Sequence, residues 1–249
     1  MTTLKRPATP DGLFLWVMHR FASLFDQHAI LKGGMALRLL DSPRSTTDID
    51  YVFVPYDSKL PVKALIEEAL AELEDATVEI SIHSKMLRAR VQVDGAPIQI
   101  EISVARRCPA IPMATGNFAR SLQQPSQVVS VMDFDTALAD KIAAWNERRL
   151  IRDLYDAYFL VGRLGSRLDL ERLDERFEKI ESRLPKFRNR KNMTRTELAQ
   201  ELNVCMSSLT QQNVEDELRP LLPSDELAGL ALRIRASLSK IVEELESNG

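Results

Sequence analysis

The chain has 249 residues and a formal net charge of −3, with 45% hydrophobic and 28% charged residues. This composition is ordinary for a globular protein and suffices for one large domain or two smaller ones. It excludes a protein that binds polyanions through its overall charge, so nucleic-acid contacts would need a local basic patch. The two distant cysteines, Cys108 and Cys205, lack metal-ligand spacing and favour a reduced, cytoplasmic protein.

The N-terminal region is predicted to alternate helices and strands. Helical spacing predicts a packing helix from Asp11 to Phe25. The apolar run at its start is interrupted by His19 and Arg20, so we expect no signal peptide and no membrane anchor. The pattern then predicts a strand at 28–31, a helix at 35–40, a strand at 50–54 and a helix at 58–74.

Two carboxylates, Asp48 and Asp50, stand at the start of the second predicted strand. Residues i and i+2 of a strand point the same way, so both acids project together while Ile49 packs. Their charges repel unless a cation lies between them, which indicates Mg²⁺ ligands. Upstream, Gly33 and Gly34 would let phosphates approach the backbone at a helix N-terminus. An isolated pair of acids is more often a solvated strand end, and the glycines and a third acid favour the metal site.

Three further strands are predicted at 77–83, 86–93 and 98–104, and Asp94-Gly95 predicts a hairpin between the last two. In the third of these strands isoleucines alternate with polar residues, of which Glu101 is the acid. Such an acid usually marks the solvated face of an edge strand. If the strand returns beside the two aspartates, however, Glu101 would complete a three-carboxylate site for two Mg²⁺ ions.

Two blocks of sequence resemble a known family. The first is Leu31-Lys32-Gly33-Gly34-x-Ala36-Leu37…Arg44-x-Thr46-x-Asp48-Ile49-Asp50, and the second is Asp140-Lys141…Arg152-Asp153-Leu154-Tyr155-Asp156. Together they resemble the AbiEii/AbiGii toxin-like nucleotidyltransferases of the DNA polymerase β-like superfamily. The resemblance implies an α/β (α+β) fold, with a mixed-sheet nucleotidyltransferase domain at 1–125 and a helical domain at 126–249 that closes the cleft.

The resemblance also implies an activity. A member of this family would use an NTP and two Mg²⁺ ions to add nucleotides to the 3′ end of tRNA, or of another RNA acceptor, and so block translation. It would act as a toxin that has a cognate antitoxin as its partner, and it would not bind a membrane. Transfer onto a protein side chain, and a non-catalytic RNA-binding or partner-binding module, remain alternatives. Thr46 stands where the family tends to have serine, and Met35 replaces its small hydroxyl residue, so backbone N–H groups would bind phosphate there.

The second block has helical spacing throughout 135–161, which places Lys141, Arg148 and Arg152 in one sector. A charged stripe is ordinarily a solvated face. The resemblance implies instead that Lys141 neutralises the β- and γ-phosphates and that Arg148 or Arg152 adds positive charge. On an unbroken helix Asp156 lies closer to Lys141, whereas a break near 146–150 favours Asp153, so both acids remain candidates.

Two aromatic residues in this segment, Trp145 and Tyr155, could stack on a nucleobase, although burial in a helical core is commoner. The rest of the chain is predicted to be helical, at 169–184, 194–209, 214–222 and 224–246. A basic cluster without acids is a candidate RNA-backbone site or a solubilising loop, and it comprises Arg183, Lys186, Arg188, Arg190, Lys191 and Arg195, with Phe187 available for stacking.

Overall fold

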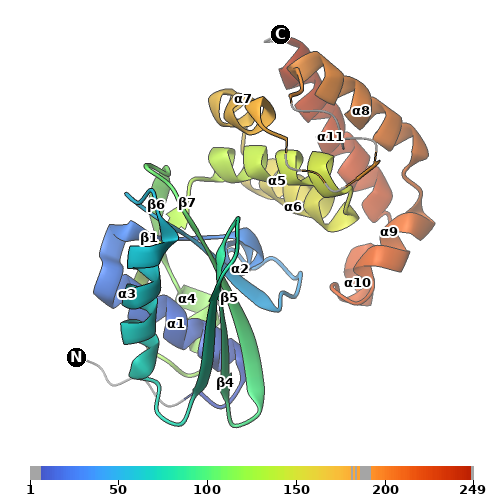
Figure 1. Cartoon of the computed structure of the whole chain (residues 1–249). Coiled ribbons are helices and arrows are strands. Elements are labelled where there is room, and N and C mark those ends of the chain that lie inside the picture. Colours follow the sequence, from blue (N-terminus) through green and yellow to red (C-terminus); the bar gives the residue numbers. More distant parts are fainter. Residues whose placement is uncertain (1–6, 181, 183, 186–191, 248–249) are drawn as a thin grey trace. The chain divides into compact units, whose positions relative to one another are not determined.

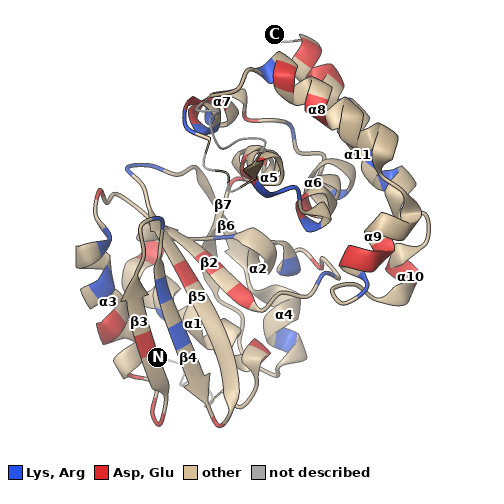
Figure 2. Ribbon diagram, turned by 45° about the vertical axis from the view of Figure 1, so that its right-hand side comes forward, with Lys and Arg blue, Asp and Glu red and all other residues tan. Residues whose placement is uncertain are grey.

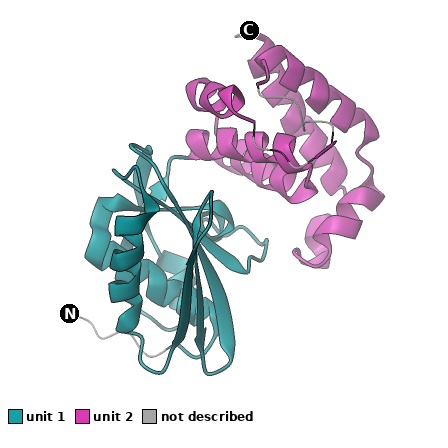
Figure 3. Ribbon diagram, viewed as in Figure 1, with its two compact units in different colours: residues 1–133 teal, residues 134–249 magenta. Residues whose placement is uncertain are grey.

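The computed structural model describes residues 7–180, 182, 184–185 and 192–247, and the chain forms two compact units (Figure 3). Unit 1 is Met1–Asp133 and unit 2 is Phe134–Gly249. The units divide after Asp133, and not at residue 125, because strand β7 (Val128–Met132) pairs with β1 (Ala29–Lys32) inside the sheet of unit 1. The expected α/β fold, a mixed sheet followed by a helical region, is confirmed.

The described residues of unit 1 form a seven-stranded sheet in the order β3-β4-β5-β2-β1-β7-β6 (Figure 1). Strands β2 and β5, and β1 and β7, run parallel, while the other neighbours are antiparallel. In chain order the elements of unit 1 are α1 (Pro10–Phe25), η1 (Asp26–His28), β1, α2 (Gly33–Arg38), β2 (Asp48–Phe53), α3 (Lys59–Ala71), β3 (Thr77–Ile82), β4 (Leu87–Val93), β5 (Ala96–Val104), β6 (Ala110–Ala114), α4 (Gly116–Ser121) and β7.

One face of this sheet carries the core of unit 1. Tyr51 and Phe53 of β2 pack against Phe21 of α1, with ring centroids 5.0 and 5.9 Å away. Burial raises the pKa of Tyr51 far above its ordinary value, so its hydroxyl stays neutral. Helix α1 begins where it does because Thr9 caps it, accepting a hydrogen bond from the Gly12 N–H at 3.1 Å.

The opposite face of the same strands is polar. Successive residues of a strand point to opposite faces, so the partners of the buried residues project away from the core. Figure 2 shows acidic and basic residues along these strands. The polar residues are Asp48 and Asp50 on β2, Gln99, Glu101 and Ser103 on β5, Arg88, Arg90 and Gln92 on β4, and Thr77, Glu79 and Ser81 on β3, and they are half-buried or exposed.

Two strands and a helix of unit 1 were not predicted from the sequence: β6, β7 and α4. Strand β6 contains Pro112, which removes a backbone donor and therefore argues against a strand. It is tolerated because β6 lies at the edge of the sheet. Strand β7 is a short, mostly apolar run, a pattern that does not distinguish strand from helix.

Unit 2 is helical, as predicted, but several helix ends differ. Its helices are α5 (Phe134–Arg148), α6 (Ile151–Leu164), α7 (Leu170–Glu178), α8 (Arg195–Ser208), α9 (Gln211–Leu218), α10 (Ser224–Leu227) and α11 (Leu230–Ser247). Of the two alternatives for 135–161, the broken helix is the one observed, because Arg149 takes a φ of 59° and ends α5. Likewise Gly229, with a φ of 65°, separates α10 from α11. Residues 211–213, expected as a linker, begin α9, because Thr210 and Asn213 form a capping box.

None of the helices in the described parts of either unit combines the length and apolar character that a membrane span requires.

Candidate active site

The carboxylates of Asp48 and Asp50 lie on the polar face at the start of β2, where both residues are half-buried. The parallel register of β2 and β5 sets Asp48 beside Gln99 and Asp50 beside Glu101. The prediction that the strand bearing Glu101 returns beside the two aspartates is therefore confirmed at the level of the backbone. Directly paired strand residues have Cβ atoms about 5 Å apart, within reach for carboxylates that share a cation.

The two glycines before α2 pack against side chains of this site. Gly33 has a φ of 73°, and a Cβ added there would lie 3.0 Å from Asp50 Cγ and closer still to Asp50 Oδ2. A Cβ on Gly34 would lie 2.6 Å from Arg44 Nη2 and 3.1 Å from Thr46 Oγ1. Side chains at these two positions would thus displace the groups that line the site, which is a packing reason for the double glycine.

The loop that leads into β2 is held by Arg44 and Thr46. Arg44 is only 7% exposed, and its Nη1 donates a hydrogen bond to the carbonyl of Ser45 at 3.2 Å. The Thr46 hydroxyl donates to the carbonyl of Asp48 at 3.1 Å, so it fixes the backbone from which the first aspartate projects. Arg44 received no role from the sequence, although an arginine between a double glycine and an acid pair was a usable signal.

Met35, which stands where the resembling family has a hydroxyl residue, is fully buried in α2. Its side chain is part of the core of unit 1 and lies out of reach of a ligand in solvent. The expected contribution of this turn to phosphate binding therefore depends on backbone N–H groups.

The third acid, Glu101, is held by two donors. Arg88 Nη2 and Gln99 Nε2 each donate a hydrogen bond of 2.8 Å to the same oxygen, Glu101 Oε1. Arg88 lies directly across from Glu101 on β4, whereas Asp50 lies on the other side, on β2.

A divalent cation is implied at this site by the resemblance. Mg²⁺ prefers carboxylate oxygens, and the donor chemistry and strand register of Asp48, Asp50 and Glu101 suit it. However, no three His, Cys, Asp or Glu side chains among the described residues are gathered closely enough to hold a metal ion. Glu101 Oε1 is bound instead to Arg88 on the neighbouring strand.

In unit 2 the basic residues of the second block are paired with buried acids. Lys141 Nζ lies 2.6 Å from Asp156 Oδ2, and Arg148 binds both oxygens of Asp153 at 2.6 and 2.5 Å. The side chains of both aspartates are 1% exposed. Arg152 is exposed, and its backbone N–H donates to Glu217 Oε1 at 2.9 Å.

The expected link between a helix break and the acid that binds Lys141 is wrong. The helix does break after Arg148, yet the partner of Lys141 is Asp156 and not Asp153. Because only two residues separate α5 from α6 and the two helices pack together, the chain reverses. Residues next to the turn, Arg148 and Asp153, then meet each other, and residues farther from it, Lys141 and Asp156, do the same.

The aromatic residues of this segment belong to the core. Trp145 and Tyr155 are 2% and 1% exposed, so the burial expected as the commoner outcome is confirmed and stacking on a nucleobase is wrong. The guanidinium of Arg149 lies 4.3 Å from the centre of the Trp145 ring.

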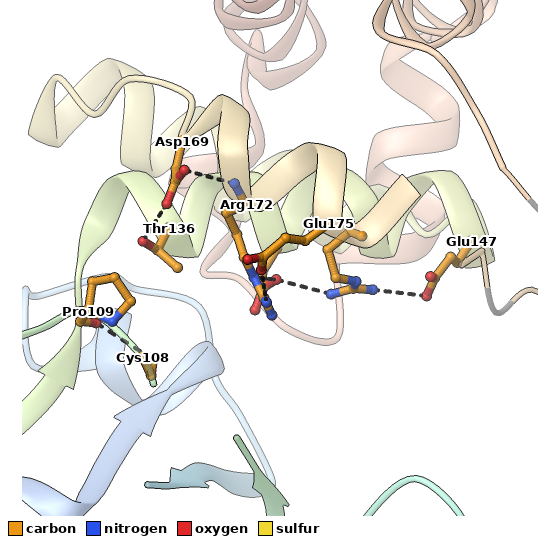
Figure 4. Close-up of polar contacts among 9 residues, drawn as sticks. Cys108, Pro109, Thr136, Glu147, Asp169, Arg172 and Glu175 are labelled. Atoms are coloured by element: carbon orange, nitrogen blue, oxygen red, sulfur yellow. Dashed lines mark hydrogen bonds and ion pairs between the residues drawn. The ribbon is translucent and has the colours of Figure 1, made fainter. Parts of the chain in front are cut away.

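Helix α7 is bound to α5 by arginines that pair with acidic residues of α5 (Figure 4). Arg172 and Arg176 both donate to Asp140 Oδ1, at 2.9 and 3.1 Å, and Arg176 also binds Glu147 at 3.1 Å. Asp140 therefore orients the helix that carries Lys141 by holding α7. In the basic cluster, residues 183, 186–188 and 190–191 lie outside the described residues, and Arg195 binds Asp174 Oδ2 at 2.5 Å.

The family model for the nucleotidyl transferase AbiEii toxin of type IV toxin–antitoxin systems matches residues 16–244, nearly the whole chain. The chain belongs to this family. As an AbiEii-family protein it is an NTP-dependent nucleotidyltransferase and a toxin-type member of a type IV toxin–antitoxin family. A comparison with curated protein sequences finds no match.

Solved structures share the fold of this AbiEii-family chain. The nucleotidyltransferase toxin MenT4 (Rv2826c) of Mycobacterium tuberculosis H37Rv is 14% identical, with a TM-score of 0.60 over 94% of this chain and 83% of its own. JHP933 from Helicobacter pylori is 16% identical, with a TM-score of 0.52 over 95% and 91%. An H. pylori nucleotidyltransferase is 14% identical, with a TM-score of 0.55 over 98% of both chains.

Proposed function

We propose that this AbiEii-family protein transfers nucleotides from an NTP to the 3′ end of tRNA, in a reaction that requires a divalent cation, and thereby blocks translation. The observation that carries the proposal is the register of β2 and β5, with Asp48 and Asp50 on one polar face and Glu101 beside Asp50. Paired acids on a rigid strand suit phosphoryl-transfer chemistry, in which catalysis is largely positioning and charge neutralisation.

In this proposal Asp48, Asp50 and Glu101 hold two Mg²⁺ ions. When bound, such ions would neutralise charge on the triphosphate and help the attacking hydroxyl to lose its proton. Gly33 and Gly34 present backbone N–H groups to the phosphates, and Thr46 keeps the loop before Asp48 in place. The acceptor 3′-oxygen forms a bond to the α-phosphorus, the bond from that phosphorus to the bridging oxygen breaks, and pyrophosphate leaves.

The basic residues of unit 2 complete the proposal. Lys141, Arg148 and Arg152 supply positive charge to the triphosphate, and Asp153 and Asp156 hold the first two of these side chains. The pairing supports this because a buried carboxylate fixes the direction of the cation bound to it.

The biological setting is proposed from the family. The MenT4 structure is described as that of a nucleotidyltransferase toxin, and a cognate antitoxin is the partner we propose for this chain. We also propose a cytoplasmic location, where the proposed tRNA acceptor is used in translation.

The test is a transfer assay with each of the four labelled NTPs, total RNA and Mg²⁺. We expect label in the tRNA band with wild-type protein, and none with Asp48→Ala. Label that survives ribonuclease but not protease would instead identify a protein side chain as the acceptor. Equal labelling by Asp48→Ala and wild-type protein would refute the assignment of the reaction to this site.

A further inference from the structure

We propose that Arg88 competes with the divalent cation for Glu101 and so sets the affinity of the acid site for metal. The inference rests on the proposed function, because it assigns a role to a residue beside the proposed metal ligands. Arg88 would act through Glu101, as a positioning residue that does not itself touch the substrate.

The geometry that supports competition is the strand order β4-β5-β2. Glu101 on the middle strand has Arg88 as its direct partner on β4 and Asp50 as its direct partner on β2. Its carboxylate is bound on the β4 side, where Arg88 Nη2 lies 2.8 Å from Oε1. A metal ion held by Asp48 and Asp50 would lie on the β2 side, so Arg88 and the ion would compete for the Glu101 carboxylate.

The ion pair is strong enough to matter because it is shielded. The side chains of Arg88 and Glu101 are 31% and 20% exposed, and the same Oε1 also accepts from Gln99. Hydrogen bonds between charged groups are stronger than neutral ones, and partial burial reduces screening by salt.

The chain offers a matched control two residues away. Arg90 lies on the same strand and the same polar face, and its direct partners are Glu79 and Gln99. It is exposed, and it makes no ion pair with any residue that the structure describes. Replacing Arg90 removes the same charge from β4 without releasing Glu101, so it separates competition from a general effect of charge.

The experiment measures binding of Mn²⁺ to the full chain without NTP, from the electron paramagnetic resonance signal of free Mn²⁺. We expect Arg88→Met to bind Mn²⁺ about fivefold more tightly than wild type, the effect of releasing one half-exposed ion pair. Arg88→Lys, which keeps a cation, should lie near wild type, and Arg90→Met should change the dissociation constant by less than about twofold. In a Glu101→Gln background, Arg88→Met should have no effect.

An unchanged or weakened affinity for Mn²⁺ in Arg88→Met would overturn the proposal, since Arg88 would then be neutral or would support the metal site. If Arg88→Met does not fold, Arg88→Gln serves in its place, because its amide retains an N–H donor, and the same outcomes apply. A double variant, Asp48→Asn with Asp50→Asn, distinguishes failure of the proposed metal site from failure of the role proposed for Arg88. If it binds Mn²⁺ like wild type, the proposed metal site fails; if it does not bind and Arg88→Met is unchanged, only the role of Arg88 fails.

Discussion

Gly33 and Asp50 approach each other so closely that a Cβ atom on Gly33 would stand 3.0 Å from Asp50 Cγ and nearer still to Oδ2. Position 33 therefore requires glycine because the Asp50 carboxylate leaves no room for a Cβ atom, whether or not phosphates also approach the backbone there. This contact links the double-glycine turn to Asp50, seventeen positions later in the chain.

Gly33→Ala is predicted to lower the rate of nucleotide transfer at least about a hundredfold, because displacement of a positioned group by about 1 Å has such an effect. Its positive φ should also cost about 1–2 kcal/mol in the free energy of unfolding. Gly95→Ala is the control, since Gly95 has a φ of 83° but no atom within 4 Å of an added Cβ. That variant should lose similar stability and keep its activity. Transfer rates and urea unfolding measure the two effects, and equal activity in both variants would contradict the prediction.

The two ion pairs of unit 2 are predicted to differ in their effect on stability. Lys141→Met leaves the buried Asp156 without its 16% exposed partner, and should cost about 3 kcal/mol in the free energy of unfolding. Arg148→Met should cost about 1 kcal/mol, because Arg148 is 46% exposed and water can replace it at Asp153.

Urea unfolding can isolate this effect to unit 2. The chain has two tryptophans, Trp16 in unit 1 and Trp145 in unit 2, so a Trp16→Phe background leaves Trp145 fluorescence as the probe. A larger loss of stability in Arg148→Met than in Lys141→Met would show that burial of the cation does not control the energetics of these pairs.

His19 is predicted to make unit 1 sensitive to acid. Its Nε2 lies 2.9 Å from Thr115 Oγ1, and burial lowers its pKa from 6.5 to about 4. Between these two values the unfolded chain binds a proton that the folded chain does not. Stability is therefore retained above pH 6.5 and falls as the pH drops toward 4, by up to about 3 kcal/mol.

The measurement is thermal unfolding between pH 7 and 4.5, followed by Trp16 fluorescence in a Trp145→Phe background. His19→Gln keeps a hydrogen-bonding side chain but cannot take up the proton, so its unfolding temperature should fall less steeply on acidification. His83→Gln, at an exposed position, should retain the wild-type slope. Identical slopes for wild type and His19→Gln would show that this histidine does not carry the acid sensitivity.

Part of the site could be predicted because it depends on local periodicity. The spacing of Asp48 and Asp50 determines that they share a face, and the alternation around Glu101 places its side chain opposite the buried isoleucines. The pairing of β5 with β2 was only a possibility at this level, because the Asp94-Gly95 hairpin joins β5 to β4 and does not determine its other neighbour. The inferences about these side chains rest on the geometry of a β-strand, in which successive side chains point to opposite faces.

Other features required information that the sequence alone does not carry. The Glu101 side chain is bound by Arg88, which lies thirteen positions earlier in the chain and on the neighbouring strand. The break at Arg149 uses a positive φ in a residue that ordinarily favours helix, so helical spacing continued across it. The burial of Met35 is likewise a tertiary effect of packing α2 onto the sheet.

The most direct test of the central claim is the rate of Mg²⁺-dependent nucleotide transfer to tRNA by Asp50→Asn, compared with Glu79→Gln. Both variants remove one carboxylate from the same polar face of the sheet, but Asp50 lies beside Glu101 on β2 and Glu79 lies on the edge strand β3. We predict that Asp50→Asn loses at least about a thousandfold in rate, as expected for a ligand of the reacting centre, while Glu79→Gln stays within about twofold of wild type. Comparable rates for the two variants would contradict the assignment of the transfer reaction to this acid pair.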